Sequence, residues 1–555
     1  MTPDPDHGSL RLVALGGLGE FGLNALLLEC EDERLLVDAG ALFATAELPG
    51  VDSVVPDFRY LAERRDSVRG IVLTHGHEDH IGALSFALQA APVPVFGSAL
   101  TLGFVRRRLQ ERGVEADLRL LTPRQAVEVG RFRVNPIRVA HSVVDSLALA
   151  IETPAGVVLM SGDFKIGTGA AADEQTDVES LSAWGDRGVL VLLSDSTNVE
   201  MRGRTGGEDE VMPAFEEVFA STRGRVLVSC FATSVPRIQR AARAALAAGR
   251  SIAFVGRRMA DNADVAMQLG LLDIPPASVL PLTALPDYPA GGLCLFVSGS
   301  QGEPFSALSM IGVDEHREVA VGPGDTVVLS SRPIPGNERA VSRLIGNLFR
   351  RGCDVVHGGT ARVHVSGHAS QDELLEMIQR VRPRHFVPVH GEYRMLAQHA
   401  RLAVQAGIHA DRVFVMEDGE VLTFADGRAA KAGNVAAGRV LLDRSGVEEL
   451  EEVVVRDRRH LSSEGIVVPV VVLDRQTGRL ESETELVTRG FVDWDQWPGL
   501  MEAARDVVVE VIETRPPEEH HDPSLTRERL RMELRRLFRK RTQRRPMVIP
   551  VVMEV

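Results

Sequence analysis

The chain has 555 residues, too many for a single hydrophobic core, so two to four domains are expected. Its contents of 44% hydrophobic and 25% charged residues are those of a globular protein, and no apolar run approaches the ~20 residues that span a bilayer. The net charge of −15 argues against a uniformly basic coat for nucleic acid, although a local basic track could still bind phosphates. Four scattered cysteines argue against a disulfide framework, and the first residues lack a signal-peptide pattern, so a cytoplasmic location is expected.

The first strong motif spans residues 74–82 and follows a short apolar run that predicts a buried strand. It places His75, His77, Asp79 and His80 within six residues. In an extended chain, alternate residues share a side, so His75 and His77 can bind one cation. A turn into a helix would direct Asp79 and His80 to a second cation. The motif therefore predicts a dinuclear metal site, against the alternative of a polar loop with solvated histidines.

Further candidate ligands lie at the ends of later strands. They are His141 after the strand predicted over 132–140, Asp163 after residues 157–162, and His390 after residues 386–389. Taken singly, each would more often be an ordinary loop residue. Their coincidence with the first motif favours a role in metal binding.

Between these ligands the chain alternates strands and helices, which predicts a parallel sheet. The strands are expected at 225–228, 251–255, 293–297 and 326–329, and small, mostly polar residues follow them, among them Ala232, Thr233, Ser234, Ser298, Ser300 and Ser331. Open α/β sheets bind ligands at the carboxyl ends of their strands, and backbone N–H groups there suit phosphate. The alternative is that these glycines and serines only form turns.

The spacing of the first motif, the lone His141, the Gly-Asp at 162–163 and the late His390 resembles the metallo-β-lactamase superfamily. Three elements in order, an acidic strand end at Asp195, Ser366-Gly367-His368 and Val389-His390-Gly391-Glu392, resemble the motifs of its β-CASP nucleases. The stretches 14–20, 194–198, 298–303 and 330–338 are similar to those of the ribonuclease J family, and this likeness covers nearly the whole chain.

The resemblance implies a fold and a ligand set. The fold is α/β: a metallo-β-lactamase αββα sandwich with an inserted β-CASP domain and a small α+β C-terminal domain. The expected parts are a disordered N-terminus at 1–9, the sandwich at 10–208 and 368–448, the β-CASP domain at 209–367, a linker at 449–464, and the C-terminal domain at 465–555. One cation would be held by His75, His77 and His141, the other by Asp79, His80 and His390, with Asp163 bridging.

The resemblance also implies the activity of a metal-dependent ribonuclease. It would degrade 5′-monophosphorylated RNA from the 5′ end, cut RNA internally, and act in RNA maturation and decay. A hydroxide activated by two divalent ions, Zn²⁺ or alternatively Mn²⁺ or Mg²⁺, would attack the phosphodiester. Asp79 would also accept the water proton, and His368 would protonate the leaving oxygen. Asp195 would orient a ligand such as His390.

The 5′-phosphate is expected in a closed pocket one nucleotide from the cations. The candidate residues are Ala232, Thr233, Ser234, Ser298, Ser300, Ser331, His364, Val365, Ser366, Gly367 and His368. Such a pocket would accept a monophosphate but lack room for a triphosphate.

The C-terminal region contains a basic helix predicted from Ser524 to about Arg545, and a strand predicted over residues 547–555 closes it. Its basic residues are either a solvated face, with Leu530, Leu534 and Leu537 turned inward, or a surface for RNA or another subunit. The expected partners are single-stranded RNA, a homodimer or homotetramer formed through this domain, and an RNA-decay complex, without a membrane.

Three competing functions remain at this point. One is a nuclease that acts on DNA or only internally. The second is a small-molecule hydrolase of the lactamase or glyoxalase type, which the long insert disfavours. The third is a metal-free RNA-binding scaffold, which the complete ligand set disfavours.

Overall fold

The structure, a computed structural model, describes residues 8–43, 48–167, 174–425, 427–443, 449–493, 496–497, 499–514, 516 and 523–555. The N-terminal segment expected to be disordered, 1–9, lies outside the described residues up to position 7. The chain divides into two compact units, one of Met1–Phe43 with Val54–Val440 and one of Ala44–Ser53 with Leu441–Val555. Among the described residues, no helix combines the length and apolarity needed to cross a bilayer.

Two β-sheets enclose the main core of the first unit, where Leu12, Leu28 and Val72 of one sheet pack in the same cluster as Leu149 and Val387 of the other. The first sheet has the order β23-β22-β1-β3-β4-β7-β8-β9, with β1 at Leu10–Gly16, β3 at Ala25–Cys30, β4 at Glu33–Val37, β7 at Val68–Val72, β8 at Val95–Gly97, β9 at Leu118–Leu120, β22 at Glu420–Ala425 and β23 at Arg428–Asn434. The second has the order β10-β11-β12-β13-β14-β20, with β10 at Val127–Val129, β11 at Phe132–Arg138, β12 at Leu147–Thr153, β13 at Gly156–Met160, β14 at Val191–Asp195 and β20 at His385–Val389.

Helices cover the outer faces of these sheets. On the second sheet, Trp184 of α5, Leu374 of α11 and Leu402 of α12 pack against strand residues such as Ala148. These helices span Val178–Arg187, Gln371–Val381 and Tyr393–Gln405, respectively. In the described part of the chain, four helices lie between strands of the first sheet: α1 at Arg59–Ala62, α2 at Glu78–Ile81, α3 at Leu84–Ala90 and α4 at Ala99–Glu111. The layers confirm the predicted αββα sandwich.

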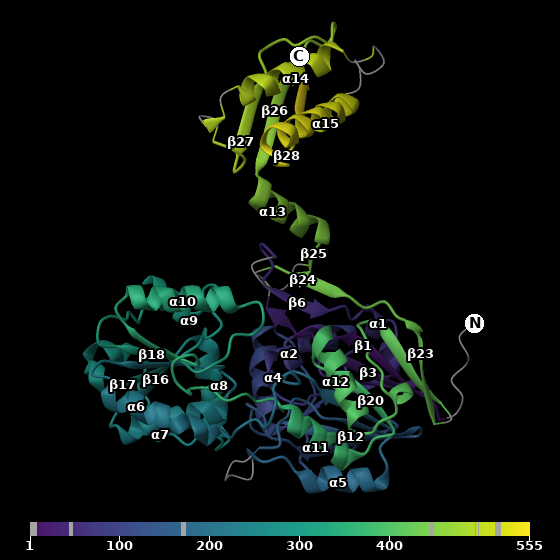
Figure 1. Ribbon diagram of the computed structural model, residues 1–555, viewed down its shortest axis with the longest axis vertical. Coiled ribbons are helices and arrows are strands. Elements are labelled where there is room, and N and C mark those ends of the chain that lie inside the picture. Colours follow the sequence, from purple (N-terminus) through teal and green to yellow (C-terminus); the bar gives the residue numbers. More distant parts are fainter. Residues whose placement is uncertain are drawn as a thin grey trace. The chain divides into compact units, whose positions relative to one another are not determined.

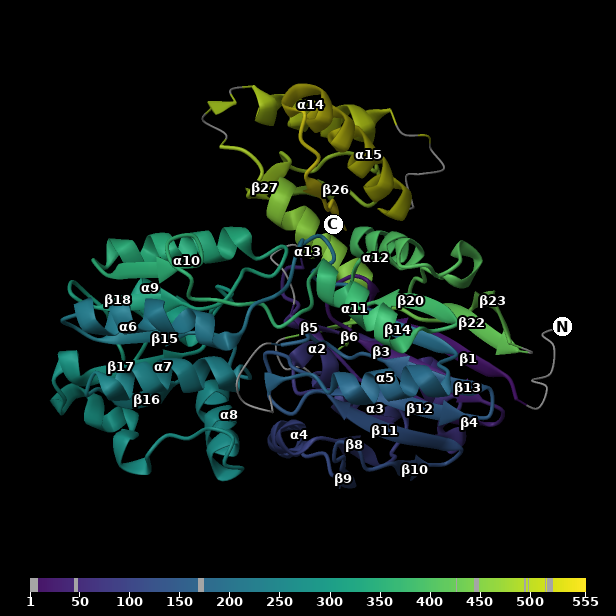
Figure 2. The ribbon, with the colours of Figure 1, turned by 60° about the horizontal axis from the view of Figure 1, so that its bottom comes forward.

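A second α/β domain, called here the inserted domain, enters between β14 and β20, which are parallel neighbours in the second sheet. Its five strands are all parallel in the order β16-β17-β15-β18-β19, and helices cover both faces of their sheet, with α9 and α10 on one side and α6 and α7 on the other (Figures 1 and 2). The three central strands, β17, β15 and β18, are mainly apolar and buried throughout, as expected for a parallel sheet that is covered on both faces. The strands are β15 at Val226–Ser229, β16 at Ser251–Val255, β17 at Leu293–Val297, β18 at Thr326–Leu329 and β19 at Asp354–His357, and the helices are α6 at Met212–Ser221, α7 at Val235–Ala247, α8 at Arg257–Gln268, α9 at Ala307–Val313 and α10 at Glu338–Arg350.

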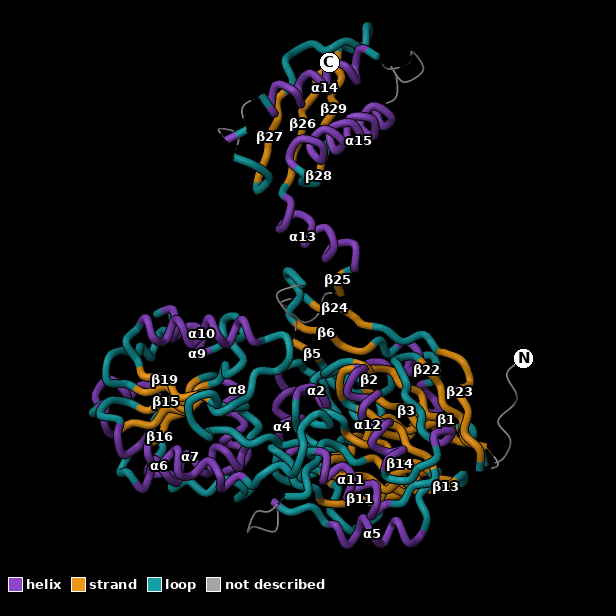
Figure 3. Tube along the Cα trace, viewed as in Figure 1, coloured by secondary structure: helices purple, strands orange, loops and turns teal. Residues whose placement is uncertain are grey.

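The second unit is the predicted small α+β domain (Figure 3). Strand β26 (Ile466–Leu473) alternates buried and half-buried residues, which shows that one face of this sheet forms a core. It pairs with β27 at Glu485–Arg489, β28 at Met547–Val548 and β29 at Val551–Glu554, and α14 at Leu500–Glu513 and α15 at Pro523–Thr542 pack on the sheet. In α15, Leu530 and Leu534 are fully buried and Leu537 is partly buried, as predicted.

The remaining described strands are short. A further helix lies in the segment that was predicted to be a linker. Strands β2 (Leu18–Gly19) and β21 (Gly391–Glu392) pair in parallel. Residues 449–464 contain α13 (Glu452–Glu464), and the domain boundaries stay predictions. The other short strands are β5 at Leu42–Phe43, β6 at Ser53–Pro56, β24 at Arg439–Leu442 and β25 at Glu449–Leu450.

Candidate metal centre

The first histidine motif connects β7 to α2, as its sequence predicts. His77 is the last residue before α2 and has extended backbone angles (φ −72°, ψ 155°), whereas Asp79 and His80 lie in the first turn of the helix. The change from strand to helix therefore divides the four side chains into two pairs.

His75, His77, His141 and Asp163 form one group of candidate ligands, whose ligand atoms all lie within 4.8 Å of one another. Nδ1 of His77 is 3.0 Å from Nε2 of His75 and 3.1 Å from Nε2 of His141. Burial lowers the pKa of His77 to about 4 and the pKa values of His75 and His141 well below their usual range. Three neutral imidazoles thus direct their nitrogens to one point, which is the donor set that a cation requires.

Asp79, His80, Asp163 and His390 form the second group. Oδ2 of Asp163 is 3.4 Å from Nε2 of both His80 and His390, and Oδ2 of Asp79 is 3.2 Å from Nε2 of His390. Burial alone would lower the pKa of His390, but Asp163 and the other nearby carboxylates outweigh it and raise that pKa to about 9. Burial would also lower the pKa of His80, but Asp163, Asp79 and Asp38 outweigh it and raise that pKa well above its usual range. The negative charge of these carboxylates can be balanced either by protons on the two histidines or by a bound cation.

Asp163 belongs to both groups through the same oxygen. Its Oδ2 is 3.6 Å from Nε2 of His75 and 3.9 Å from Nε2 of His141, in addition to the contacts above. A shared carboxylate oxygen of this kind can bridge two cations. The structure therefore brings together all seven residues that the sequence proposed as ligands, from four separate parts of the chain.

Asp38, which sequence reasoning missed, supports the ligands from the end of β4. Its Oδ2 lies 2.8 Å from Nδ1 of His80 and accepts the Thr74 hydroxyl at 2.9 Å, and its Oδ1 accepts the Thr74 backbone N–H. The Thr74 hydroxyl in turn lies 3.1 Å from Nδ1 of His75. These bonds place protons on Nδ1 and leave Nε2 of both histidines for a cation. The signal in the sequence was an acidic residue after an apolar strand.

Two ligands are held by residues near the inserted domain. Nδ1 of His141 donates to the Gly367 carbonyl at 2.9 Å, and a Cβ at position 367 would lie 2.8 Å from the His141 ring, so only glycine fits there. Nδ1 of His390 lies 2.8 Å from the Thr197 hydroxyl, which donates to Asp195. His390 itself has a left-handed backbone (φ 55°), a strained conformation of the kind that concentrates at functional sites.

His368 and Asp195 form a pair beside both groups. Nδ1 of His368 lies 2.8 Å from Oδ2 of the buried Asp195. Burial lowers the pKa of His368, but Asp195 outweighs it and the pKa is raised above its usual value. Asp195 was expected to orient His390; its direct partner is His368, and Thr197 carries its link to His390. Asp163, Asp195, His368 and His390 form a third group of candidate ligands, which overlaps the second. Within it, Nδ1 of His368 and Oδ2 of Asp195 are engaged in their mutual bond.

Six of the residues predicted to bind phosphate follow the carboxyl ends of β15, β17 and β18, which neighbour one another in the parallel sheet: Ala232, Thr233, Ser234, Ser298, Ser300 and Ser331. The other five, residues 364–368, lie in the segment between β19 and α11. The Ser331 hydroxyl donates to the Ser300 carbonyl at 3.5 Å, which joins two of these loops. The loop after β15 reaches the metal cluster through Phe231, whose ring centre is 6.2 Å from that of His77. Ser234, Ser300 and Ser331 are buried, whereas Ala232, Thr233, Ser298, His364 and Ser366 are half-buried and Val365 and Gly367 are buried.

A buried ionic cluster, also missed from sequence, holds the segment 363–368. Arg237, 2% exposed, donates to the carbonyls of residues 330, 363 and 365 and pairs with Glu208 at 2.9 Å. Lys165, 3% exposed, donates to the carbonyl of residue 366 and lies 3.6 Å from Glu208. Burial, and then Arg237, lower the pKa of His364 to about 3, so this imidazole is neutral.

Family models match four parts of the chain. Residues 18–180 match the metallo-beta-lactamase superfamily, and residues 223–348 match the ribonuclease J beta-CASP domain. Residues 355–413 match the Zn-dependent metallo-hydrolase RNA specificity domain, and residues 453–555 match the ribonuclease J C-terminal domain.

Full-length relatives are similar over almost the whole chain. Ribonuclease J2 of Bacillus subtilis (strain 168) is 36% identical over 550 residues, which cover 99% of each chain. Ribonuclease J of Mycolicibacterium smegmatis is 37% identical, covering 100% of this chain and 99% of that one, and ribonuclease J of a Synechocystis species is 38% identical, covering 99% and 87%. A solved structure of a protein of unknown function from Enterococcus faecalis V583 shares the fold, with a TM-score of 0.52 and 14% identity over 75% of this chain and all of that one.

Proposed function

The chain belongs to the ribonuclease J family, and from this we propose that it is a metal-dependent ribonuclease that degrades RNA from a 5′-monophosphate end, cuts RNA internally, and acts in cytoplasmic RNA maturation and decay. The observation that carries the proposal is the pair of ligand groups that share Oδ2 of Asp163, next to the His368–Asp195 pair. A small-molecule hydrolase does not need the inserted domain beside such a centre.

We assign two divalent cations to the centre. His75, His77, His141 and Asp163 would hold one, and Asp79, His80, Asp163 and His390 the other. Imidazole-rich groups suit Zn²⁺, whereas the carboxylates and the phosphate substrate also suit Mn²⁺ or Mg²⁺. When bound, such a pair supplies a hydroxide near neutral pH and neutralises phosphate oxygens during in-line attack.

His368 and Asp79 would move the protons. Burial lowers the pKa of His368 but Asp195 raises it above its usual value, which favours the protonated imidazole, and the bond to Asp195 through Nδ1 leaves Nε2 to donate to the leaving 3′-oxygen. Burial would raise the pKa of Asp79, but His80 and His390 outweigh it, so the carboxylate is ionised and can accept the proton of the attacking water. A bond forms from the water oxygen to phosphorus and the bond to the 3′-oxygen breaks. The remaining RNA then carries a new 5′-monophosphate.

We place the 5′-phosphate of the RNA at the carboxyl ends of the strands of the inserted domain. The support is the buried hydroxyls of Ser234, Ser300 and Ser331, and the Phe231 contact that links one of these loops to His77. Because His364 is neutral, its imidazole ring can donate one hydrogen bond to the phosphate but contributes no net charge. A site closed in this way would accept a monophosphate and exclude a triphosphate.

The test uses one internally labelled RNA with either a 5′-monophosphate or a 5′-triphosphate, in the presence of Zn²⁺, Mn²⁺ or Mg²⁺. Mononucleotides should appear from the monophosphate RNA alone, and His77→Ala and His368→Ala should abolish them. His409→Ala is the control, because this exposed histidine lies outside the centre. Internal fragments that form regardless of the 5′ end would show an endonuclease instead, and no cleavage with any metal would show a scaffold.

We also propose that the second unit supports a homodimer or homotetramer. Several of its apolar side chains are exposed, among them Leu525 and Met532 of α15 and Val551 and Met553 of β29. Light scattering of the full chain and of Met532→Glu measures this; a monomer in both cases would contradict it.

A further inference from the structure

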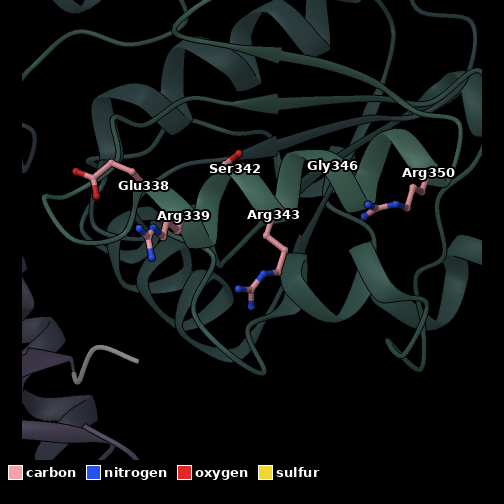
Figure 4. A pocket seen from close by; sticks show the side chains of 6 residues that line it. All are labelled: Glu338, Arg339, Ser342, Arg343, Gly346 and Arg350. Carbon is pink, nitrogen blue, oxygen red and sulfur yellow. The ribbon is translucent and has the colours of Figure 1, made fainter. Parts of the chain in front are cut away.

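One face of α10 in the inserted domain carries three arginines without acidic partners. Arg339, Arg343 and Arg350 are exposed and, with Glu338, Ser342 and Gly346, line a shallow depression of about 430 Å³ (Figure 4). In the part of the chain that the structure describes, none of the three forms an ion pair, and the contact found is Arg350 donating to Asn347. Their spacings of four and seven residues place them in a row along one side of the helix, over a rise of roughly 16 Å.

The row begins at the edge where the RNA end is placed. The loop after β17, which carries Ser300, packs against the first turn of α10, because a Cβ at Gly302 would lie 2.8 Å from the Ala340 carbonyl carbon. Gln301 in the same loop accepts the Ile334 N–H at 2.7 Å and donates to the Arg332 carbonyl at 3.0 Å. Arg339 therefore lies next to this edge in the sequence and in space, and Arg343 and Arg350 lead away from it.

We propose that this face of α10, the α10 arginine row, binds the phosphate backbone of substrate RNA outside the catalytic centre. The proposal rests on the proposed function, because it assumes that RNA enters at the adjoining edge. A chain with a net charge of −15 repels RNA overall, so binding needs local unpaired cations. Guanidinium groups bind phosphate oxygens bidentately, and contacts to phosphate carry no direct information about base sequence.

The test measures RNA affinity against salt concentration in the full chain. The variant is Arg339→Gln, Arg343→Gln, Arg350→Gln, and both it and the parent carry His77→Ala to prevent cleavage. For a 30-nucleotide 5′-monophosphorylated RNA, loss of three contacts should reduce the slope of log Kd against log salt by about 2, since each phosphate contact on a single strand contributes about 0.7. At 0.1 M salt this corresponds to an affinity loss on the order of 100-fold. Binding of a four-nucleotide RNA should not change.

A matched control removes three other exposed arginines of the same unit that form no ion pair with a described residue: Arg223→Gln, Arg243→Gln, Arg401→Gln. It changes the net charge equally, so equal salt slopes for the control and the α10 variant would overturn the proposal. The proposal would also be overturned if the α10 variant changed the mass of the protein in light scattering but not its RNA affinity. That result would mean that the arginines bind an acidic face of a second copy of the chain. With His77 intact, the α10 variant should cleave the four-nucleotide RNA at the same rate as the parent protein. If the parent protein does not cleave this RNA, the proposed function is refuted instead.

Discussion

Asp38 should control the affinity of the second cation, although it touches neither proposed ion. The carboxylate is fully buried, and its two oxygens serve Nδ1 of His80, the Thr74 hydroxyl and the Thr74 backbone N–H. In Asp38→Asn, one of these oxygens becomes an NH₂ group that faces either the donors of His80 and the Thr74 hydroxyl or the Thr74 N–H. In either orientation of the amide, its NH₂ group therefore faces another hydrogen-bond donor and at least one of these bonds is lost.

Loss of such a partner typically weakens a metal site by 10–100-fold, which is about 1.4–2.7 kcal/mol. The effect should fall on the cation held by His80, because His75 reaches Asp38 only through Thr74. The assay is a Zn²⁺ titration against a competing chelator dye, which resolves two binding constants per chain. One of the two constants should weaken and the other should change little.

Asp57→Asn is the matched control, because Asp57 is also a buried carboxylate of the first unit that accepts a backbone N–H, but it follows β6 and bonds Arg59. Two unchanged binding constants in Asp38→Asn would refute the reasoning. Equal losses in both variants would show a general effect of the lost charge rather than the alignment of His80.

Three further results are expected. His368→Gln should lower kcat on RNA on the order of 10²–10⁴-fold while the metal content and RNA affinity stay unchanged, and loss of bound metal would contradict a role in proton transfer. Glu208→Gln should reduce the free energy of unfolding in urea by about 3–5 kcal/mol, because it leaves Arg237 buried without its carboxylate; an unchanged unfolding midpoint would contradict this. Burial lowers the pKa of His399 to about 3, whereas a histidine in the unfolded chain has a pKa near 6.5. As the pH falls, the unfolded state therefore binds a proton before the folded state does. The free energy of unfolding should fall by about 1.4 kcal/mol per pH unit between pH 6.5 and 3. His399→Gln should reduce this pH dependence in urea unfolding between pH 7 and 5, and an identical dependence would exclude His399 as its source.

The layers and the candidate ligands could be predicted because their signals are local. The His-x-His-x-Asp-His spacing encodes the change from β7 to α2, and the apolar strands of the inserted domain end in small polar residues that the structure places on one edge. His390 is the extreme case, since more than two hundred residues separate it from Asp163. The end of its strand could still be recognised from the apolar run before it, and in the structure that strand, β20, pairs directly with β14.

The supporting residues could not be predicted because their roles arise only on folding. Thr197 is an ordinary strand-end hydroxyl until β14 and β20 bring it to 2.8 Å from His390. Lys165 and Arg237 look like surface residues in sequence, and they become buried only when the inserted domain packs on the sandwich and Glu208 offsets both charges. Sequence periodicity carries no signal for such pairs, whose partners are tens of residues apart.

The central claim is that two cations sharing Asp163 form one hydrolytic centre for RNA. The measurement that tests it most directly is the rate of mononucleotide release from 5′-monophosphorylated RNA as the metal-free protein is titrated with Mn²⁺ or Zn²⁺. The rate should stay near zero up to one cation per chain, rise between one and two, and remain absent in Asp163→Ala at any concentration. Full activity at one cation per chain, or activity that survives in Asp163→Ala, would contradict the account.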